Sequence, residues 1–408
     1  MNILYVCHRF PFPPKRGGKI RPFNMIRHLG EAGHRVTVCS LARSAQEADE
    51  GAGIAPHCAA YEIAQVSEPV QFARMLARLP LPGPSSMGYF YSPDLARKVQ
   101  RLIDGQRWDL IFVHCSSVAQ YVAHVRGVPK ILDFGDMDSQ KWLEYAAIKP
   151  FPLSLGYRLE GLKMLAAEKR LARQFDLCTA TTRAEWQTLH DYGTGAATGW
   201  FPNGVDAGYF SPGDTPHEAD TVSFIGRMDY YPNIECMQRF CAQVWPLLLQ
   251  ARPGLKLLIV GADPKPEVLA LGALPGVTVT GSVPDVRPFV RRSAVNVAPL
   301  AIARGTQNKS LEAMAMGVPV VTTRLAAGGV DAEAEQHLLV ADTPQDTALA
   351  VLRIVQNPAE RTRLAAAGRA RMQSHHAWPR SMQRLDALIE QCRSHCGRPT
   401  VPALEPTT

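Results

Sequence analysis

The chain has 408 residues and a formal charge of +7; 46% of its residues are hydrophobic and 20% are charged. This composition excludes a disordered chain, and the length exceeds what one hydrophobic core usually serves, so we expect two domains. The positive charge favours anionic partners, such as nucleotide phosphates or an anionic membrane surface. No basic run is dense enough to indicate nucleic acid, and we expect no nucleic-acid partner.

The cysteines and the first residues indicate a cellular location. Nine cysteines are scattered without a Cys-x-x-Cys pair, which predicts reduced thiols, a reducing compartment and no structural zinc. The N-terminal MNILYVCHRFPFPPKRGG lacks the features of a signal peptide, and no apolar run reaches the roughly 18–20 residues that span a bilayer. We predict a cytoplasmic protein, with peripheral attachment to the cytoplasmic face of the inner membrane as an alternative.

Short apolar strands alternate with helical patterns along the whole chain. Five strands are predicted in the first half, over residues 2–7, 35–41, 109–114, 130–134 and 177–182, and five in the second half, over 221–226, 255–261, 277–281, 294–299 and 317–323. Runs that are apolar on both faces suit parallel strands covered by helices on each side. The repeated strand–helix units predict an α/β fold of two Rossmann-like, doubly wound parallel sheets facing each other across a cleft.

Composition also predicts where the domains divide. The stretch GWFPNGVDAGYFSPGDTPHEAD (199–220) is rich in Gly, Pro and Asp and precedes a new series of strand–helix units. We therefore predict an N-terminal domain over residues 1–200 and a C-terminal domain over 201–377. Residues 378–396 carry apolar residues at helical spacing and predict an amphipathic helix, and residues 397–408 predict a disordered tail.

The stretch ARGTQNKSLEAMAMGVPVV carries the strongest functional signal. It leads from a glycine-containing loop into a short helix, which the Gly-Val-Pro sequence should end. A helix N-terminus presents unpaired N–H groups and about half a positive charge, so it favours an anion. Gly305 lets the backbone approach closely, Thr306 and Asn308 offer hydrogen bonds, and Lys309 adds a full positive charge. Together they predict a phosphate or diphosphate site.

Glu312 lies three residues after Lys309, on or near the same helix face. A carboxylate can accept two hydroxyl hydrogens at once, so a ribose diol is a natural partner for it beside a phosphate. The alternative is an ion pair between Lys309 and Glu312 on a solvated helix face, and the pattern alone does not decide between the two.

Several motifs in this order resemble those of retaining nucleotide-sugar glycosyltransferases of the GT-B fold, in family 4 (glycosyl transferases group 1). They are PPKRGG followed by HLGEAGHRVTV, then PNGVDAGYF, FIGRMDYYPN and NKSLEAMAMGVPVV. Two segments also resemble the sugar transferases associated with bacterial exosortase (PEP-CTERM) exopolysaccharide systems. They are CHRFPFPPKRGGKIRPFNMIRHL and GRMDYYPN. The resemblance implies that the N-terminal domain serves the acceptor and the C-terminal domain the nucleotide-sugar donor.

The resemblance implies roles for individual residues of the donor site. Glu312 matches the second glutamate of the family's Glu-x7-Glu motif, which binds the donor ribose. Arg227 and Lys309 resemble the basic pair that holds the donor diphosphate and stabilises the departing nucleoside diphosphate. Gly17 and Gly18 match the glycine loop of the first domain, which approaches the donor phosphate.

Two further implied residues and one departure from the family pattern concern the sugar and the acceptor. His114 resembles the family's histidine near the transferred sugar, and Asp133 with His114 is a candidate for orienting the acceptor. Arg304 occupies the place of the first motif glutamate, which usually contacts hydroxyls of the donor sugar. This departure leaves the sugar open, permits an additional phosphate or carboxylate contact, and is compatible with weakened activity.

The implied reaction moves a sugar, with retention, from a nucleoside-diphosphate sugar to a glycan or polyprenyl-linked acceptor in exopolysaccharide biosynthesis, with no cofactor and no metal. Breaking the anomeric C–O bond builds negative charge on the diphosphate, which Arg227, Lys309 and the helix N-terminus would stabilise. Retention would proceed by front-face attack, with the leaving phosphate taking the proton of the acceptor.

Other interpretations of these residues stay open. Asp136 and Asp138 form an Asp-x-Asp string that could bind a metal or cap a loop, and Asp136 could instead contact the acceptor together with Asp133. His8 could line the cleft or be an ordinary loop histidine, and Arg227 could simply pair with Asp229. The basic amphipathic helix predicted over 157–175 could pack on the core or bind a membrane surface.

Rival functions are also open. A nicotinamide-dependent dehydrogenase would need Gly-x-Gly-x-x-Gly after the first strand, and HRFPFPPKRGG stands there instead. A sugar-nucleotide 2-epimerase would share the two-domain architecture but use no acceptor. A nucleotide-sugar-binding protein that has lost turnover is a third alternative, suggested by Arg304.

Overall fold

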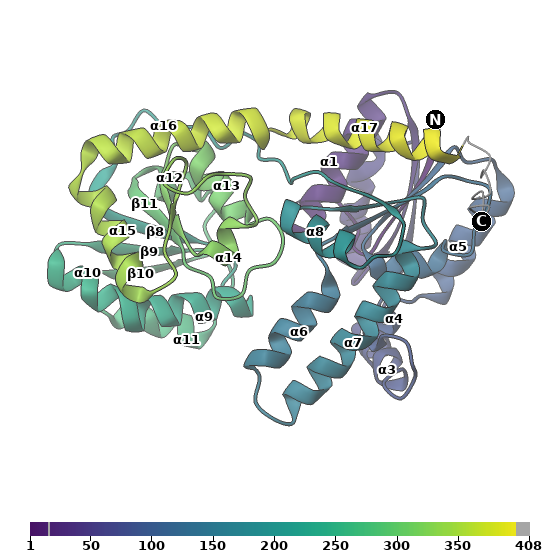
Figure 1. Cartoon of the computed structure of the whole chain (residues 1–408), viewed down its shortest axis with the longest axis horizontal. Helices are drawn as coiled ribbons and strands as arrows, with labels where there is room; N and C mark the ends of the chain where they lie inside the picture. The colour runs from purple at the N-terminus through teal and green to yellow at the C-terminus, as the bar shows by residue number, and fades with distance from the viewer. Residues whose placement is uncertain (15–16, 397–408) are drawn as a thin grey trace, which may run out of the picture. The chain divides into compact units, whose positions relative to one another are not determined.

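The computed structural model describes residues 1–14 and 17–396, which form two compact α/β units (Figure 1). The first unit comprises residues 1–181, 185–201 and the chain from Met382 on, and the second comprises 202–381 together with 182–184. The tail predicted over 397–408 lies outside the described residues. No described helix has the combination of length and hydropathy that a bilayer crossing requires.

The first unit is built on a fully parallel seven-stranded sheet in the order β3-β2-β1-β4-β5-β6-β7. Its strands are β1 (Asn2–Cys7), β2 (Arg35–Ala42), β3 (Ala60–Gln65), β4 (Leu110–His114), β5 (Lys130–Gly135), β6 (Leu177–Ala180) and β7 (Ala197–Trp200). The strand order reverses between β1 and β4, and the carboxyl ends of strands at such a switch point are the usual place for a ligand.

Helices cover this sheet and extend beyond its edge. They are α1 (Gly17–Glu31), α2 (Ala45–Glu50), α3 (Glu68–Ala77), α4 (Ser85–Tyr89), α5 (Pro93–Gly105), α6 (Asp138–Ile148), α7 (Leu153–Ala172) and α8 (Arg183–Asp191). Helix α5 shows how the sequence sets a boundary: Ser92 caps it by accepting a hydrogen bond from the Leu95 amide, and Pro93 occupies the first turn, where no amide donor is needed.

Helix α17 (Trp378–Cys396) brings the chain back to the first unit after the second has been completed. Its apolar stripe is buried, at Met382, Leu385, Ile389 and Cys392. Asp386 on the same helix lies 2.9 Å from Nε2 of His28 in α1. The last helix is therefore part of the first unit's own structure.

The second unit is built on a parallel six-stranded sheet in the order β10-β9-β8-β11-β12-β13. Its strands are β8 (Glu218–Ile225), β9 (Lys256–Val260), β10 (Val277–Gly281), β11 (Ser293–Ala298), β12 (Val320–Thr322) and β13 (Leu339–Val340). Its helices are α9 (Tyr231–Arg239), α10 (Trp245–Ala251), α11 (Pro266–Leu269), α12 (Arg287–Arg291), α13 (Asn308–Ala315), α14 (Arg324–Ala327), α15 (Pro344–Gln356) and α16 (Pro358–His375). Here the strand order reverses between β8 and β11.

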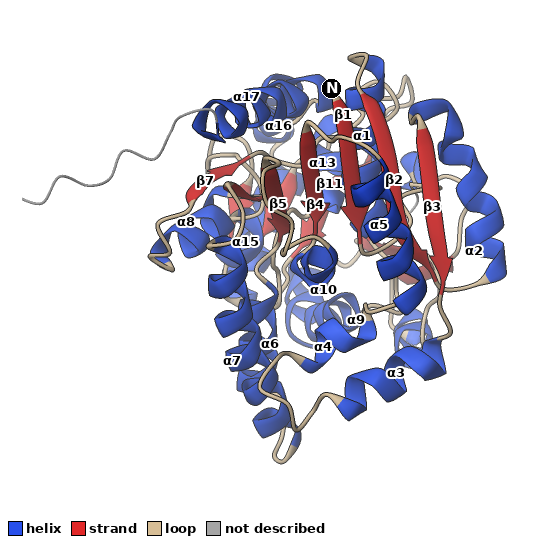
Figure 2. Ribbon diagram, turned by 90° about the vertical axis from the view of Figure 1, so that its right-hand side faces the viewer, coloured by secondary structure: helices blue, strands red, loops and turns tan. Residues whose placement is uncertain are grey.

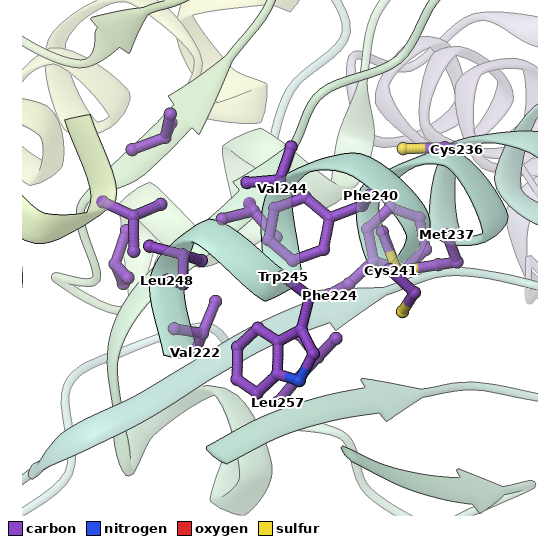
Figure 3. Close-up of a cluster of buried hydrophobic side chains, with 14 of the residues drawn as sticks. Val222, Phe224, Cys236, Met237, Phe240, Cys241, Val244, Trp245, Leu248 and Leu257 are labelled. Carbon is purple, nitrogen blue, oxygen red and sulfur yellow. The ribbon is translucent and has the colours of Figure 1, made fainter. Parts of the chain in front are cut away.

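One face of the second sheet carries a core built around Trp245 (Figure 3). Val222, Phe224 and Leu257 come from the strands, while Phe240 lies in a π-helical turn (Phe240–Val244) that joins α9 to α10. The indole N–H of Trp245 donates to the carbonyl of Pro275 at 2.9 Å, so this large ring is buried without leaving its polar atom unpaired. The core fixes the strand ends that carry the site.

The predicted fold of two Rossmann-like, doubly wound parallel sheets is confirmed, and each of the ten predicted strands is present in the described residues. Sequence reasoning missed β3, β7 and β13. All three lie at sheet edges, and their side chains are mostly half-buried or exposed. An edge strand needs no long apolar run, and so it lacks the signal by which the central strands were predicted.

Gly261 follows β9 at a point where two strands leave no room for a side chain. Its φ is +156°, and a Cβ there would lie 1.7 Å from the carbonyl oxygen of Gly226, which follows β8. The amide of Gly226 in turn donates to the carbonyl of Val260 at 3.1 Å. This contact fixes the backbone immediately before Arg227.

We expect Gly261→Ala to lower the free energy of unfolding of the second unit by about 2–4 kcal/mol, because the new Cβ forces β8 and β9 apart. Thermal and urea denaturation measure the effect. Gly272→Ala is the matched control, because its Cβ would meet only Val279, at 3.8 Å. Equal stability of the two variants would contradict the assigned contact.

Candidate active site

Helix α13 begins at the carboxyl end of the second sheet, after the loop that leaves β11. Three side-chain oxygens at its start are buried and have no hydrogen-bond partner among the described residues: Thr306 Oγ1, Asn308 Oδ1 and Ser310 Oγ. Buried polar atoms are nearly always paired in folded proteins. Their gathering at a helix N-terminus, where backbone amides favour an anion, marks a candidate site for a polar, anionic ligand.

Lys309 lies in the first turn of α13 and reaches over the core. Its Nζ is 4.6 Å from the centroid of the Phe224 ring and donates a hydrogen bond to Oδ1 of Asn233. Burial lowers the pKa of the Lys309 ammonium to about 8, against the opposing effects of Cys236 and Glu312. An anion placed beside this ammonium would restore the favourable electrostatics that burial removes.

Glu312 lies one turn further along α13, and its side-chain carboxylate makes no ion pair or hydrogen bond with another described residue. Burial raises the pKa of its carboxyl to about 7, and the nearby Lys309 only partly offsets this. The ion pair between Lys309 and Glu312 that the sequence left open is therefore not formed within the described residues. The carboxylate stays available to accept hydrogen bonds.

Arg227 follows β8 and is held by two carboxylates. Its Nε and one Nη donate to Asp229 at 3.0 and 2.7 Å, and the same Nη contacts Asp263. The pairing with Asp229 that the sequence left open is thus present, and it raises the pKa of the guanidinium. The side chain is still 35% exposed, so a ligand can reach it.

Asn233 joins the two basic residues. Its Nδ2 donates to the carbonyl of Arg227 at 2.8 Å, while its Oδ1 accepts the hydrogen bond from Lys309. Asn233 is buried near the start of α9. One amide side chain therefore fixes the backbone of Arg227 and the head group of Lys309 in a single arrangement.

The loop before α13 is shaped by two glycines. Gly305 has a φ of +64°, which a side chain disfavours, and a Cβ on Gly329 would lie 2.1 Å from the Gly305 carbonyl oxygen. Arg304 is half-buried in this loop, and its carbonyl accepts a hydrogen bond from Gln307 at 3.2 Å. The close approach of the two backbones holds the predicted phosphate loop in place.

In the first unit, His114 and Asp133 lie together at the carboxyl ends of β4 and β5. Nδ1 of His114 is 2.8 Å from Asp133 Oδ2, and the carboxylate also accepts two hydrogen bonds from Arg21 at 2.9 and 3.0 Å and one from Thr179 at 2.9 Å. The Arg21 guanidinium and His114 hold the pKa of Asp133 well below its usual range, although burial acts the other way. Asp133 is 0% exposed, so a ligand could not touch its carboxylate directly.

His8 and a polar pocket lie next to this pair. The rings of His8 and His114 are 5.7 Å apart, and burial lowers the pKa of His8 well below its usual value. The pocket has a volume of about 390 Å³, and its lining includes His8, Arg9, Lys19, Arg43, Glu47 and Glu50. His8, which the sequence left as either a cleft residue or an ordinary loop histidine, lines this pocket of the first unit.

The remaining predicted residues lie in the first unit. Gly17 and Gly18 are the exposed first residues of α1. Asp136 accepts a hydrogen bond from Thr181 at 2.9 Å, and Asp138 is the first residue of α6. Within residues 1–14 and 17–396, no group of three or more His, Cys, Asp and Glu side chains could hold a metal ion.

The structure brings together several predicted residues and adds others that sequence reasoning missed. Arg227 and Lys309 are linked within the second unit, and His114 and Asp133 within the first. Asn233 was quoted only as part of a motif; its position just after a proline that starts a helix gave no hint of its two contacts. Arg21, the buried partner of Asp133, carried no signal, because a charged residue in α1 is ordinarily expected to face solvent.

Comparison with known proteins agrees with this architecture. Residues 16–204 match the family described as glycosyl transferase 4-like domain, and residues 219–357 match glycosyl transferases group 1. Solved structures with the same fold include sucrose-phosphate synthase from Thermosynechococcus elongatus (17% identity, 97% of this chain and 100% of that chain, TM-score 0.69) and HepE from Anabaena in complex with UDP (15%, 96% and 100%, TM-score 0.69).

A similar curated protein is the GDP-mannose-dependent monoacylated alpha-(1-6)-phosphatidylinositol monomannoside mannosyltransferase of Corynebacterium glutamicum. It is 25% identical over 210 residues, which cover 46% of this chain and 55% of that protein. The alignment thus spans about half the length of the curated relative.

Fold and domain matches together define a class: the chain contains two glycosyltransferase domains and has the fold of GT-B glycosyltransferases. In chain order these are a glycosyl transferase 4-like domain and a glycosyl transferases group 1 domain, the second of which contains Arg227, Asn233 and α13.

We expect Asp133→Asn to destabilise the first unit by about 3–5 kcal/mol, because it leaves the buried Arg21 guanidinium without its carboxylate. His114→Asn removes one hydrogen bond from the same carboxylate and should cost only about 1 kcal/mol. Denaturant unfolding at neutral pH compares them. Similar losses in the two variants would show that Arg21 does not depend on Asp133.

Glu312→Gln should stabilise the second unit at pH 8. Because the folded-state pKa of Glu312 is raised to about 7, its carboxylate opposes folding above that pH, and the penalty fades as pH falls toward the unfolded value. Allowing for partial exposure, we expect a gain of about 1–2 kcal/mol at pH 8 that disappears near pH 5. Thermal denaturation across this range tests it, with the exposed Glu267→Gln as the control; a gain independent of pH would contradict the assigned pKa.

Proposed function

We propose that this protein transfers a sugar, with retention, from a nucleoside-diphosphate sugar to a glycan or lipid-linked acceptor in bacterial exopolysaccharide biosynthesis. The observation that carries the proposal is the cluster at the start of α13. There, three unpartnered buried polar atoms, a partly desolvated ammonium and an unpaired carboxylate lie within five residues of one helix N-terminus. A diphosphate joined to a ribose offers the complementary groups.

In this proposal each donor group has a partner. The diphosphate lies against the N-terminus of α13, between Lys309 and Arg227, with Gly305 allowing close approach of the backbone. The ribose diol donates to the Glu312 carboxylate. Arg227 then exchanges part of its contact with Asp229 for phosphate oxygens. The mannosyltransferase of C. glutamicum is named for a GDP-mannose donor, and HepE was crystallised with UDP, which supports a nucleotide sugar as donor.

Catalysis would rest on stabilising the leaving group. Cleavage of the anomeric C–O bond places negative charge on the departing nucleoside diphosphate, and Lys309 and Arg227 stabilise that charge more than they stabilise the bound substrate. The acceptor oxygen attacks from the same face, and its proton passes to the leaving phosphate, so the configuration is retained. His114, oriented by Asp133, would position the acceptor or the transferred sugar.

The pocket beside His8 is the proposed acceptor side. Arg9, Lys19 and Arg43 contribute positive charge to its lining, although Glu47 pairs with Lys19 and accepts a hydrogen bond from the Arg43 amide at 2.8 Å. With Glu50 the lining holds three cations against two carboxylates, and this small positive excess suits an acceptor that carries a phosphate. A polyprenyl phosphate or diphosphate has that chemistry.

A catalytically weakened sugar-nucleotide-binding protein is the second candidate, because Arg304 replaces the first motif glutamate. Incubation with UDP- and GDP-sugars separates the possibilities. Release of nucleoside diphosphate that needs an acceptor supports transfer, whereas a new epimeric nucleotide sugar indicates a 2-epimerase. Binding without release, even with acceptors supplied, favours the binding protein. Neither binding nor release would reject the proposal.

We expect nucleoside-diphosphate affinity to fall as pH rises through 8, because the Lys309 ammonium, with its pKa lowered to about 8, loses its proton there. Lys309→Gln should lower turnover by about 10²–10³-fold, and Lys309→Arg should remove the pH dependence, since a guanidinium stays charged. Isothermal calorimetry with UDP and GDP between about pH 7 and pH 9 measures this. Lys256→Gln, on the exposed start of β9, is the control. An unchanged nucleoside-diphosphate affinity in Lys309→Gln would contradict the proposed donor site.

A further inference from the structure

The exposed hydrophobic side chains of this protein are concentrated on one part of the first unit. Of eighteen large hydrophobic side chains exposed in residues 1–14 and 17–396, eleven belong to two short segments, 69–82 and 145–163. The first contains most of α3 and the loop after it; the second contains the end of α6, the α6–α7 turn and the first half of α7. Figure 2 shows α3, α6 and α7 on the same side of this unit.

The turn between α6 and α7 is the most exposed part. Phe151 is 82% exposed, Leu153 58% and Leu155 51%. Leu159 and Leu162 continue the exposed row along α7, while Met164, Ala167 and Leu171 on its later turns are buried. The two halves of this helix therefore differ: side chains of its second half pack on the core, and its first half presents leucines to solvent.

The two segments form one continuous surface. Nζ of Lys163 in α7 donates to the carbonyls of Leu79 and Leu81, both at 2.7 Å. One turn earlier, the Glu160 carboxylate accepts hydrogen bonds from the amide and hydroxyl of Ser85, at 3.1 and 2.6 Å. The loop after α3 is therefore fastened along α7, and we call the combined surface of residues 69–82 and 145–163 the apolar platform.

The hairpin that carries the platform is firmly packed at its base. The Tyr157 ring lies 5.4 Å from the Trp142 ring and 5.8 Å from the Tyr145 ring. A Cβ on Gly161 would lie 2.9 Å from the side chain of Leu143, so α6 and α7 approach closely there. The exposed side chains at the turn are held away from the core by a stiff support.

The charges of the platform are almost all positive. Its two segments contain five basic residues, Arg74, Arg78, Lys149, Arg158 and Lys163, and a single acidic residue, Glu160. Glu160 is buried and its carboxylate is occupied by Ser85 and Ser86. Arg74, Arg78, Arg158 and Lys163 form no ion pair with a carboxylate of the described residues. Apolar side chains surrounded by uncompensated cations complement an anionic lipid surface.

We infer that the apolar platform docks this protein onto an anionic lipid bilayer. Phe151, Leu153 and Leu155 enter the boundary between head groups and acyl chains, a depth of about 5–10 Å, and the lysines and arginines lie near lipid phosphates with their aliphatic stems along the apolar side chains. A second copy of the chain fits this surface poorly, because a two-fold contact would set the same cations against each other. The inference is independent of the transferase activity, which could be present without it.

The test uses the full chain and vesicles of phosphatidylcholine with or without ~30% phosphatidylglycerol. We expect cosedimentation with the anionic vesicles that weakens as salt rises from ~0.05 to ~0.5 M. The triple variant Phe151→Ser/Leu153→Ser/Leu155→Ser should partition at least about tenfold less, and Arg78→Gln/Arg158→Gln should lose much of the salt dependence. The matched control is Leu349→Ser/Leu269→Ser, two equally exposed apolar residues of the second unit.

Thermal denaturation of each variant confirms that it is folded, and light scattering gives its mass. A control variant that loses vesicle binding as much as the triple variant overturns the inference. Failure of the wild-type protein to bind either kind of vesicle also overturns the inference. If, in that case, the wild-type protein is a dimer and the triple variant a monomer, the platform is an interface between copies. Nucleoside diphosphate release with a water-soluble acceptor is measured in parallel, so failure of docking and failure of the proposed transfer are separate results.

Discussion

The second unit depends on one buried amide. Asn233 holds the backbone of Arg227 with its nitrogen and the ammonium of Lys309 with its oxygen, so the two cations at the carboxyl edge of the sheet cannot move independently. The fold makes this possible because β8 and β11 are neighbours at the point where the strand order reverses. One residue from each side of that point reaches the same place, and the amide between them fixes their separation before any ligand arrives.

The carboxylates of Asp133 in the first unit and Glu312 in the second lie in opposite electrostatic environments. Asp133 is surrounded by Arg21, His114 and Thr179, which keep it ionised and make it a structural anchor. Glu312 lacks such partners, and burial therefore raises the pKa of its carboxyl to about 7. A fully satisfied buried charge stabilises a fold, whereas an unsatisfied one lowers stability and stays available for a ligand. This contrast separates positioning residues from binding residues more clearly than their positions in the sequence do.

Sequence reasoning was reliable where one element carries its own signal. Continuous apolar runs identify the central strands. The helix after Gly305 can be predicted from its charge pattern and from the Gly-Val-Pro sequence that ends it. Sequence reasoning failed where the role of a residue depends on contacts between segments that are far apart in the chain. Neither Asn233 nor Arg21 differs locally from a surface residue; each gains its role only when a strand or helix more than sixty positions away is placed against it. The exposure of Leu159 and Leu162 was equally hidden, because periodicity identifies an apolar face but does not say what covers it.

Helix α17 gives the chain an unusual order of assembly. Its buried stripe belongs to the first unit, although every residue of the second unit is translated before it. During synthesis the surface of the first unit that α17 covers therefore stays exposed until the residues from Met382 on have been made. A nonsense change just after residue 381 would spare the whole second unit and yet harm the part of the protein that is made first.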